Sequence, residues 1–393
     1  MLRLENLIAG MCPNGVPFTD IKSVAEVGTG TSNGNEADES GMYPFFIRSK
    51  IVKQKSSYEY DEEAIIIPGE GGIGEIFHYV NGKYALHQRV YRIHFEDPSI
   101  STRFIYYYME AFFKKFILRK AVSATVTSIR KPMIESFQFP VPPLEVQQEI
   151  VRILDHFTEL TAELTAELTA ELTARKEQYK YYSLSLINHA VDIKEVPIRS
   201  LGTWRGGCTP SMENSAFWSD GNIPWVSSKD MKAPLLVDTQ DHITQEALSQ
   251  TSIKLLPKNT VAIVARSGIL KHTLPVVFIP FETTVNQDIK ALTAAQNIEP
   301  RYAYHVLNAN SGNILQRTKK QGGTVDSLDI QKFMNYLVPV PPLPEQRRIV
   351  SILDRFDALC NDLTSGLPAE IAARQKQYEY YRDKLLTFPE RKP

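Results

Sequence analysis

A chain of 393 residues is long enough to bury the cores of two ordinary domains. Its three cysteines, Cys12, Cys208 and Cys360, are too few and too scattered for a disulfide framework or a zinc site. The sequence has no apolar run of membrane-spanning length and no signal-peptide pattern, and its net charge of −1 argues against a general polyanion binder. We therefore expect a cytoplasmic two-domain protein that contacts no membrane.

The glycine-rich segment from Gly69 to Gly74 matches the G-x-G-x-x-G pattern of dinucleotide-binding loops and follows an apolar run at 64–67. A dinucleotide site requires a helix directly after the glycines and an acidic residue about 20 positions later. Two runs of alternating polarity follow instead, and Asn81-Gly82 between them is typical of a β-hairpin. We therefore predict a tight turn between strands and no nucleotide cofactor.

An aromatic cluster lies in a helix-like stretch from Ser101 to Arg119. Its members are Tyr106, Tyr107, Tyr108, Phe112 and Phe113. Such rings can stack on extruded bases, but they more often fill a hydrophobic core. We expect the cluster to pack in the core.

Residues 144–195 are predicted to form a long amphipathic helix, because Pro142-Pro143 cannot lie inside a helix and apolar residues follow at steps of three and four. Three Thr-Ala-Glu-Leu tetrads at 161–172 continue it with strong helix formers. From 144 to 188 the helix would be roughly 65 Å long, at about 1.5 Å per residue. Residues 144–196 carry 10 acidic and 5 basic side chains, which favours a spacer over a DNA-binding helix. The leucines of this spacer are Leu160, Leu164, Leu168 and Leu172.

The chain then repeats itself. Val141-Pro-Pro-Leu144 returns 199 residues later as Val340-Pro-Pro-Leu343, and Asp155 returns at the same offset as Asp354. A repeat of this length indicates two copies of one structural unit, each closed by a long helix. The opening phrases of the copies are only 180 residues apart, so the second copy contains 19 additional residues, which we expect between about 231 and 262.

The second copy comprises a globular segment at 196–342 and a distal helix at 343–393, which mirror the globular segment at 1–143 and the central helix. Gly366 and Pro368 lie opposite the tetrads, so the distal helix is predicted to be kinked or broken around 364–369. Two duplicated helices of similar length most simply pack antiparallel. The predicted fold is α+β, with two β-rich domains separated by two long antiparallel helices in a coiled coil and related by an internal pseudo-two-fold repeat.

The tetrads could serve as a ruler between two DNA-binding domains. Each tetrad adds about 6 Å to a helix and rotates the next part of the chain by roughly 40°. One base pair of B-DNA rotates by roughly 35° and rises about 3.4 Å, so the rotations agree better than the translations. The alternative is a neutral low-complexity expansion that a helix tolerates.

Polar and basic residues, several of them at matched positions of the globular segments, are the candidates for DNA contact. Arg and Lys recognise guanine, Gln recognises adenine, and hydroxyl groups contact phosphate. In the first segment the candidates are Arg48, Ser49, Lys50, Gln88, Arg89 and Thr125; in the second they are Ser228, Lys229, Arg266, Lys271, Gln287, Lys319, Lys320 and Thr324. An ordinary surface or capping role is the alternative for each, and the matched glutamines could instead satisfy a repeated turn. No P-loop, zinc spacing or nucleophile elbow is found, so no catalytic or metal-binding residue is assigned.

These motifs resemble the specificity subunit of type I restriction–modification systems. The duplicated Val-Pro-Pro-Leu and Ile-Val-x-Ile-Leu-Asp segments carry the resemblance, and Pro-Pro-Leu-Pro-Glu-Gln-Arg-Arg-Ile-Val at 341–350 is especially similar. The tetrads resemble those of the type IC group, in which repeat number is associated with spacer length. The loop at 206–210 and the strand at 223–226 resemble the opening of a target recognition domain. The resemblance covers almost the whole chain and is stronger in the helices than in the globular segments.

The resemblance implies a non-catalytic subunit whose target recognition domains, at 1–143 and 196–342, each recognise one half of a bipartite, asymmetric sequence in double-stranded DNA. It also implies helices that set the spacer and dock two modification subunits, which methylate adenine with S-adenosylmethionine. Two ATP-driven restriction subunits, with Mg²⁺, would complete the enzyme. No cofactor is implied for this chain itself. The remaining alternative is a coiled-coil adaptor that joins two protein-binding domains.

Overall fold

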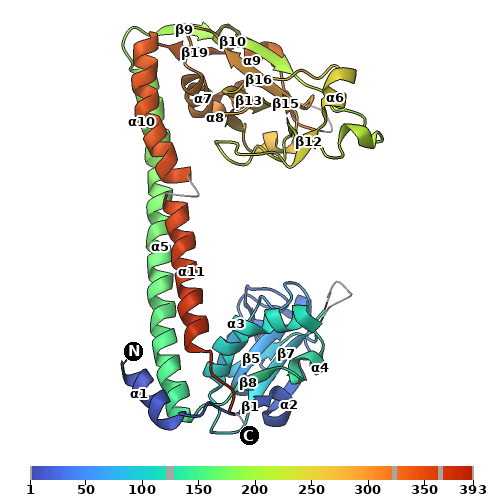
Figure 1. The fold of residues 1–393 in the computed structure, drawn as a ribbon, viewed down its shortest axis with the longest axis vertical. Helices are drawn as coiled ribbons and strands as arrows, with labels where there is room; N and C mark the ends of the chain where they lie inside the picture. The colour runs from blue at the N-terminus through green and yellow to red at the C-terminus, as the bar shows by residue number, and fades with distance from the viewer. Residues whose placement is uncertain (1, 121–127, 321–324, 362–365, 392–393) are drawn as a thin grey trace. The chain divides into compact units, whose positions relative to one another are not determined.

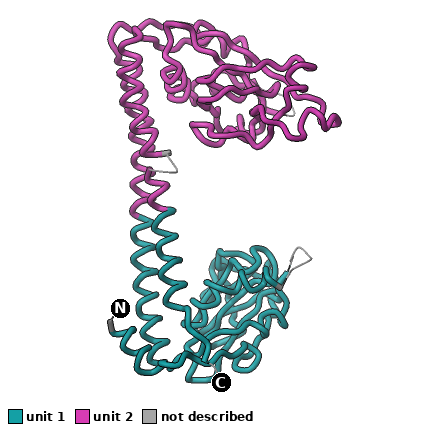
Figure 2. Tube along the Cα trace, in the orientation of Figure 1, with its two compact units in different colours: residues 1–166, 372–393 teal, residues 167–371 magenta. Residues whose placement is uncertain are grey.

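The structure is a computed structural model that describes residues 2–120, 128–320, 325–361 and 366–391. The chain divides into two compact units (Figure 2). Unit 1 comprises Met1–Ala166 and Ala372–Pro393, and unit 2 comprises Glu167–Ile371. Each unit therefore combines a globular part with segments of the long helices.

The globular part of unit 1 is a six-stranded sheet with strand order β2-β7-β5-β6-β3-β4, next to a small β1-β8 pair (Figure 1). Its strands are β1 (Phe18–Asp20), β2 (Ala25–Thr29), β3 (Tyr43–Phe46), β4 (Lys53–Lys55), β5 (Tyr60–Pro68), β6 (His78–Leu86), β7 (Val90–Phe95) and β8 (Gln138–Pro140). Its helices are α1 (Leu2–Met11), α2 (Ile21–Val24), the 3-10 helix η1 (Gly34–Glu36), α3 (Thr102–Lys120) and α4 (Lys131–Glu135). The core lies between the sheet and α3, where Tyr107 and Phe113 are buried. This confirms the core role expected for the aromatic cluster.

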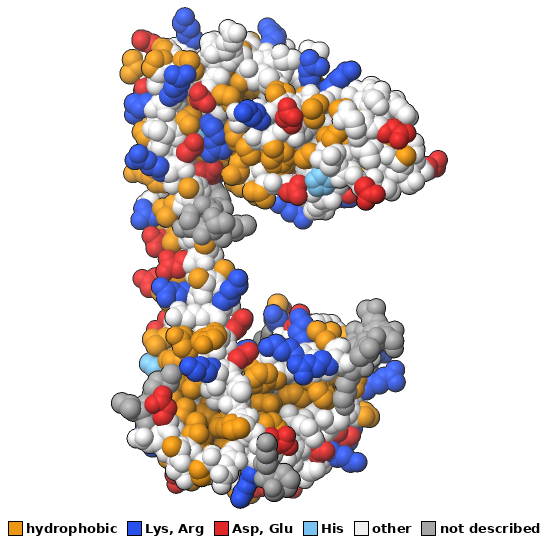
Figure 3. Space-filling model, in the orientation of Figure 1, with side chains coloured by type: hydrophobic (Ala, Val, Ile, Leu, Met, Phe, Trp, Pro, Cys, Tyr) orange, Lys and Arg blue, Asp and Glu red, His pale blue; other side chains and the backbone are white. Residues whose placement is uncertain are grey.

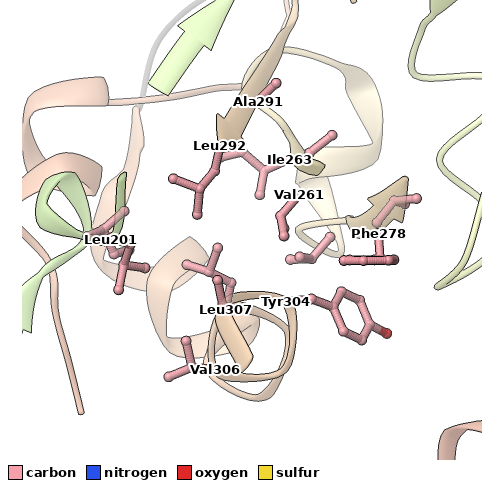
Figure 4. Close-up of a cluster of buried hydrophobic side chains, with 14 of the residues drawn as sticks. Leu201, Val261, Ile263, Phe278, Ala291, Leu292, Tyr304, Val306 and Leu307 are labelled. Carbon is pink, nitrogen blue, oxygen red and sulfur yellow. The ribbon is translucent and has the colours of Figure 1, made fainter. Parts of the chain in front are cut away.

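The globular part of unit 2 holds a four-stranded sheet, β10-β16-β13-β14, and a three-stranded sheet, β12-β11-β15. Its strands are β9 (Lys194–Pro197), β10 (Gly202–Gly206), β11 (Ile223–Val226), β12 (Asp241–Ile243), β13 (Thr260–Val264), β14 (Val276–Ile279), β15 (Thr284–Val285), β16 (Ile289–Ala294), β17 (Lys319–Lys320), β18 (Ser327–Leu328) and β19 (Leu337–Val340). Its helices are the 3-10 helices η2 (Ile198–Leu201), η3 (Ser215–Phe217) and η4 (Gly268–Lys271), and the α-helices α6 (Gln245–Gln250), α7 (Pro300–Ala309), α8 (Ser311–Thr318) and α9 (Ile330–Asn335). Figure 4 shows Val261 and Leu292 of the sheet facing Leu307 of α7 in the buried core.

The two globular parts share one topology, as the repeat predicts. The antiparallel strands β2, β7 and β5 correspond to β10, β16 and β13, and the parallel pair β3·β6 corresponds to β11·β15. In each copy the lead-in strand also pairs with the strand before the proline pair, as β1·β8 and β9·β19. The extra residues of the second copy lie between β11 and β13, where they include α6. The expected position between 231 and 262 is therefore confirmed.

The long helices are the rods of the molecule: α5 (Leu144–Asn188), α10 (Leu343–Asn361) and α11 (Leu367–Leu385). The tetrads do not interrupt α5, which confirms the predicted continuous helix from 144 to 188. The distal segment consists of two helices, in line with the interruption expected around 364–369, and residues 362–365 lie outside the described residues.

The rods pack antiparallel within each unit. In unit 1 the rings of Phe157 and Tyr381 are 6.5 Å apart, and Leu164, further along α5, shares a groove with Arg374, earlier in α11. In unit 2 the rings of Tyr182 and Phe356 are 6.2 Å apart. Val191, just beyond the end of α5, donates a backbone hydrogen bond to Glu345, near the start of α10. The expected antiparallel pairing is confirmed.

The hairpin predicted at Asn81-Gly82 is wrong. Residues 78–86 form one strand, β6, and Gly82 lies inside it with φ 111°. The reason is that β5 pairs with residues 78–84 of β6, with Glu62 opposite Gly82, so the strand continues through the turn-like dipeptide. A long partner strand here outweighs a local turn preference.

The C-terminal residues return to the first domain. The backbone N–H of Val16 donates to the carbonyl of Pro389 at 3.0 Å, and the N–H of Arg391 donates to the carbonyl of Val16 at 2.9 Å. Leu386 and Phe388 are buried in the core of unit 1. The last residues of the second copy therefore pack against the first residues of the first copy and form part of the core of unit 1.

Candidate nucleic-acid interface

Polar segments of unit 1 meet at one edge of the sheet, because β3 and β6 are parallel neighbours. Phe46 pairs with Leu86, so both strands end at the same level. Arg48-Ser49-Lys50 follows the first strand and Gln88-Arg89 follows the second. Loops beyond the carboxyl ends of parallel strands lie side by side, where ligands commonly bind. The structure thus brings together candidate residues that are about 40 positions apart in the sequence.

Glu70 connects two of these candidates. Its carboxylate accepts a hydrogen bond from Arg48 Nη1 at 2.8 Å and from Arg89 Nη1 at 3.1 Å. Hydrogen bonds from Arg89 and then from Arg48 hold the pKa of Glu70 below its ordinary value. The exposed Arg48 and Arg89 and the half-buried Glu70 form a cluster in which the carboxylate orients both guanidinium groups. We call Arg48, Glu70 and Arg89 the arginine cluster. Arg48 and Glu70, together with His87, also line a hollow of about 290 Å³.

The glycine-rich segment supplies this carboxylate. Gly71, Gly72 and Gly74 have φ of 79°, 92° and 65°, which is the left-handed region that glycine adopts without strain. The next regular element is the strand β6, so the predicted tight turn is confirmed. Backbone hydrogen bonds fix the turn, from Gly69 N–H to Arg89 carbonyl at 3.0 Å and from Ile129 N–H to Gly69 carbonyl at 2.7 Å.

Unit 2 builds an equivalent edge. Here β11 and β15 are the parallel neighbours, with Val226 opposite Val285. Ser228 and Lys229 follow the first strand, and Gln287 follows the second. The same backbone bonds recur, from Ala265 N–H to Asp288 carbonyl at 2.7 Å and from Leu328 N–H to Ala265 carbonyl at 2.8 Å. The duplicated sequence therefore presents the same polar edge twice.

The basic residues of the second edge are held less tightly. Lys229 Nζ lies 3.8 Å from Asp241, and Lys319 Nζ lies 3.3 Å from Asp326. Arg266 and Lys271 are exposed, and Arg266 forms a β-bridge with Ser327. The loop after β13 therefore adjoins the β17–β18 segment that contains Lys319 and Lys320.

The matched glutamines are not the residues that close the repeated turn. In unit 1 the preceding residue does so, because His87 Nδ1 accepts a hydrogen bond from Arg89 N–H at 3.0 Å. In unit 2 the matched Asn286 Oδ1 accepts from Asp288 N–H, also at 3.0 Å. The exposed glutamine side chains are left to make other contacts.

Each glutamine amide is oriented by a hydrogen bond to a side chain of another loop, and Gln287 Nε2 also donates to Asp288 Oδ2 at 3.5 Å. Gln88 Nε2 donates to Asn33 Oδ1 at 2.8 Å, and the hydroxyl of Thr209 donates to Gln287 Oε1 at 2.5 Å. Asn33 and Thr209 both lie in the loop that follows the first strand of their sheet, β2 or β10. An exposed amide of fixed orientation is what bidentate recognition of adenine requires.

The remaining candidates are Ser49, Lys50, Thr125, Thr324 and the four spacer leucines, and the exposure of the described ones differs from one to the next. Ser49 is half-buried and its hydroxyl accepts a hydrogen bond from Ile51 N–H at 3.0 Å, which is a local turn contact, whereas Lys50 is exposed. Thr125 and Thr324 lie outside the described residues. On the rod, Leu160 is 47% exposed and Leu168 is 8% exposed, with Leu164 and Leu172 between these extremes.

Sequence reasoning missed Glu70, Asn33 and Thr209. Glu70 lies inside the glycine motif, where attention to the glycines hid the carboxylate. Thr209 and Asn33 became visible only through partners 78 and 55 positions away. Strand pairing, which single-sequence patterns do not determine, creates these contacts.

Basic side chains gather on the globular part of unit 1 in the face that Figure 3 shows, while acidic and basic side chains alternate along the rods. In the part of the chain that the structure describes, no group of three or more His, Cys, Asp or Glu could hold a metal ion. Over the same residues, no helix has both the length and the apolar character to cross a membrane.

The comparisons with known proteins agree with this geometry. Residues 13–174 and 190–373 match the family model for the type I restriction modification DNA specificity domain. The specificity subunit of the type I restriction enzymes EcoR124I and EcoR124II of Escherichia coli is 43% identical over 297 residues, which cover 75% of this chain and 72% of that protein. A putative type I restriction enzyme specificity subunit of Haemophilus influenzae is 31% identical over 361 residues, or 89% of each chain.

A solved structure from work on complex assembly and conformational transition of the type I restriction–modification system shares the fold. It aligns with a TM-score of 0.68 and 14% identity over 95% of this chain and 98% of that one. The chain therefore belongs to the family of type I restriction–modification DNA specificity proteins. It is a DNA-specificity subunit, the non-catalytic component of a restriction–modification complex.

Proposed function

We propose that this subunit holds two target recognition domains, residues 1–143 and 196–342, and that each recognises one half of a bipartite, asymmetric DNA sequence. The duplicated polar edge supports this proposal, because two copies of one exposed surface suit two half-sites. The copies differ in their side chains, with Arg48 and Arg89 in one and Lys229 and Arg266 in the other. Different side chains in one frame would recognise different bases.

At the first edge, Arg48, Lys50, Gln88 and Arg89 contact DNA, with Ser49 at the side of the cluster. At the second edge the contacts come from Ser228, Lys229, Arg266, Lys271, Gln287, Lys319 and Lys320. Exposure supports these assignments except for Ser49, Ser228 and Lys319, which are half-buried. For Gln88 and Gln287 the orientation of the amide supports them as well. Thr125 and Thr324 stay predictions for phosphate contact.

The tetrad segment of α5 acts as the spacer ruler, as in the type IC group that its sequence resembles. Its continuous helix supports this role, because a helix converts added residues into a defined translation and rotation. The rods also dock two modification subunits, which methylate adenine with S-adenosylmethionine, and two restriction subunits that use ATP and Mg²⁺. A DNA target of this kind implies a cytoplasmic location.

Selection from a random DNA library tests the proposal. Full-length chain, alone and assembled with its modification subunits, is incubated with duplexes in which two randomised blocks flank spacers of varied length. We expect enrichment of two unrelated short sequences at one spacer length. A coiled-coil adaptor would enrich no motif, and a single contiguous motif would contradict the bipartite arrangement.

A further inference from the structure

A charged network fastens the first recognition domain to the rods. Arg103 of α3 donates to Asp155 Oδ1 of α5 through Nε at 3.0 Å and through Nη2 at 2.9 Å. The hydroxyl of Tyr107 donates to the same oxygen at 2.6 Å. Thr158 Oγ1 lies 3.4 Å from that hydroxyl and 2.9 Å from the hydroxyl of Tyr378 in α11. The domain helix is therefore linked to both rods of unit 1.

Unit 2 contains the matching network. Arg301 of α7 donates to Asp354 Oδ1 of α10 at 3.0 Å from Nε and 2.6 Å from Nη2. His305 Nε2 lies 2.7 Å from the same oxygen, and His305 Nδ1 lies 3.0 Å from the hydroxyl of Tyr179 in α5. Burial lowers the pKa of His305, so the ring is neutral, donates to Asp354 and accepts from Tyr179.

The two networks correspond position by position. Asp354 follows Asp155 by 199 residues, and Tyr378 follows Tyr179 by the same interval. Arg301 and His305 follow Arg103 and Tyr107 by 198. The tyrosine comes in each unit from the rod of the other copy. A network that recurs in both copies, with one member taken from the opposite copy each time, is specific to the junction between domain and rods.

A second fastening lies two turns earlier on the same helices. Gln147 accepts a hydrogen bond from Ser101 N–H at 2.8 Å and donates to the carbonyl of Ser99 at 2.9 Å. Gln346 makes the same pair of bonds, with Glu299 N–H at 2.8 Å and the Asn297 carbonyl at 3.0 Å. Gln147 and Asp155 are separated by about 12 Å along the helix, at about 1.5 Å per residue. Two fixed points on one rod, with a third on the other, define an orientation as well as a position.

Directional bonds suit this task better than apolar packing does. An apolar interface tolerates small rotations, whereas a guanidinium whose Nε and Nη2 both donate to one carboxylate oxygen loses its hydrogen-bond geometry when the partners rotate. The guanidinium of Arg103 is also enclosed by aromatic rings, with Tyr79 at 4.6 Å and Tyr107 at 5.0 Å from its carbon to the ring centres. Arg301 is enclosed in the same way by Phe278 at 4.8 Å and Tyr304 at 4.9 Å. Both arginines are therefore held on several sides.

We propose that the Arg103–Asp155–Tyr107–Tyr378 and Arg301–Asp354–His305–Tyr179 networks are orienting joints, which fix the angle of each recognition domain on the rods and so restrict the spacer lengths that the protein accepts. The proposal rests on the proposed function, since it presupposes two half-sites. A rotation of about 5° at the joint moves the far side of a domain with a diameter of about 37 Å by roughly 3 Å. That displacement is close to the rise of one base pair, about 3.4 Å.

The test compares spacer preference in variants of the full-length chain assembled with its modification subunits. D155N removes the charge that holds Arg103, and Y107F removes one hydroxyl while keeping the buried ring. Glu159→Gln is the matched control, because Glu159 is an exposed carboxylate one turn further along α5. Binding is measured to one pair of half-sites across spacers that differ by single base pairs, together with thermal unfolding.

We expect both joint variants to bind spacers one base pair shorter and longer that the wild type rejects, and to lose about three- to tenfold in affinity at the preferred spacer. The half-site sequences stay unchanged, and the control keeps the wild-type profile. A variant that binds more weakly in parallel at all spacers has lost stability alone, which overturns the proposal, and so does an unchanged profile. If the wild type enriches no bipartite motif, the proposed function fails instead.

Discussion

The hydroxyl groups of Thr158 and Tyr378 lie 2.9 Å apart, although 220 residues separate them along the chain. The contact joins the start of the first rod to the end of the last one. In unit 2, Tyr179 of the first copy takes the corresponding place beside His305. Each globular part is thus supported by helical segments from both copies, and changes in one rod are expected to affect DNA spacing as well as stability.

Deletion of one tetrad, residues 165–168, should shorten the preferred spacer. Four residues correspond to about 6 Å and roughly 40° of helix, which is close to the rotation of one base pair. We expect the optimum to shift by about one base pair while both half-sequences are retained. Library selection measures both properties at once. Altered half-sequences at an unchanged spacer would contradict the hypothesis that the tetrads set the spacer length.

Exchange of residues 17–140 for those of another family member should alter one half-site only. The exchanged segment contains the first polar edge, with its arginine cluster and Gln88, and leaves the second edge intact. Methylation mapping of the assembled enzyme identifies both half-sites before and after exchange. A change in both halves would show that the domains do not recognise DNA independently.

Replacement of Glu70 by glutamine should weaken discrimination at the first half-site. The carboxylate holds Arg48 and Arg89 at 2.8 Å and 3.1 Å, and its loss frees two guanidinium groups to contact phosphates. We expect tighter nonspecific binding, with a salt slope steeper by about one to two units, because each phosphate contact contributes about 0.9. Fluorescence anisotropy at several salt concentrations measures this slope.

The matched control for that experiment is Glu75→Gln. Glu75 lies in the same loop but forms its ion pair with Lys114 of α3. Its replacement should leave the base preference at the first half-site unchanged. Equal effects of the two substitutions would mean that loop charge, and not the arginine cluster, determines discrimination.

Acid should destabilise unit 2 through His305. Burial lowers the pKa of His305, so below about 6.5 the unfolded chain binds a proton that the folded chain does not. The stability that depends on the neutral ring is present above that pH and is lost as the pH falls below it. H305Q keeps a donor for Asp354 without this protonation, so its unfolding free energy should fall less between pH 7.5 and 5.5.

Tryptophan fluorescence in urea measures this effect selectively. All three tryptophans, Trp204, Trp218 and Trp225, belong to unit 2. His242→Gln is the control, because His242 is paired with Asp238, which is 69% exposed. The prediction is contradicted if wild type and H305Q have the same dependence on pH.

Much of the architecture could be predicted from the sequence, because regular periodicity and duplication carry it. The start of α5 follows from the prolines before Leu144, and its course follows from the apolar spacing; it ends at Asn188, before the expected boundary at 195, because Lys194–Pro197 pair with β19 as strand β9. The hairpin at Asn81-Gly82 failed because pairing with β5 depends on residues about 20 positions away. Local signals describe elements well, while sheet order depends on contacts that no local pattern contains.

In the candidate site, too, local sequence patterns identified some residues, while contacts between distant segments revealed others. Matched offsets identified Gln88 and Gln287, and the structure adds that His87 and Asn286 close their turns. Glu70 was not identified, since its partners come from two other loops. The arginines at 103 and 301 gave no sequence signal either, because their offset of 198 differs by one from that of the aspartates they bind.

The closing contact at Val16 has a consequence for biosynthesis. Unit 2 is one uninterrupted stretch, Glu167–Ile371, and can be complete before the remaining residues leave the ribosome. Unit 1 must wait for Leu386, Pro389 and Arg391, which pack against or bond to its first strand region. Unit 1, which contains the earlier residues, is therefore completed after unit 2, and loss of residues 386–391 should damage unit 1 and leave unit 2 intact.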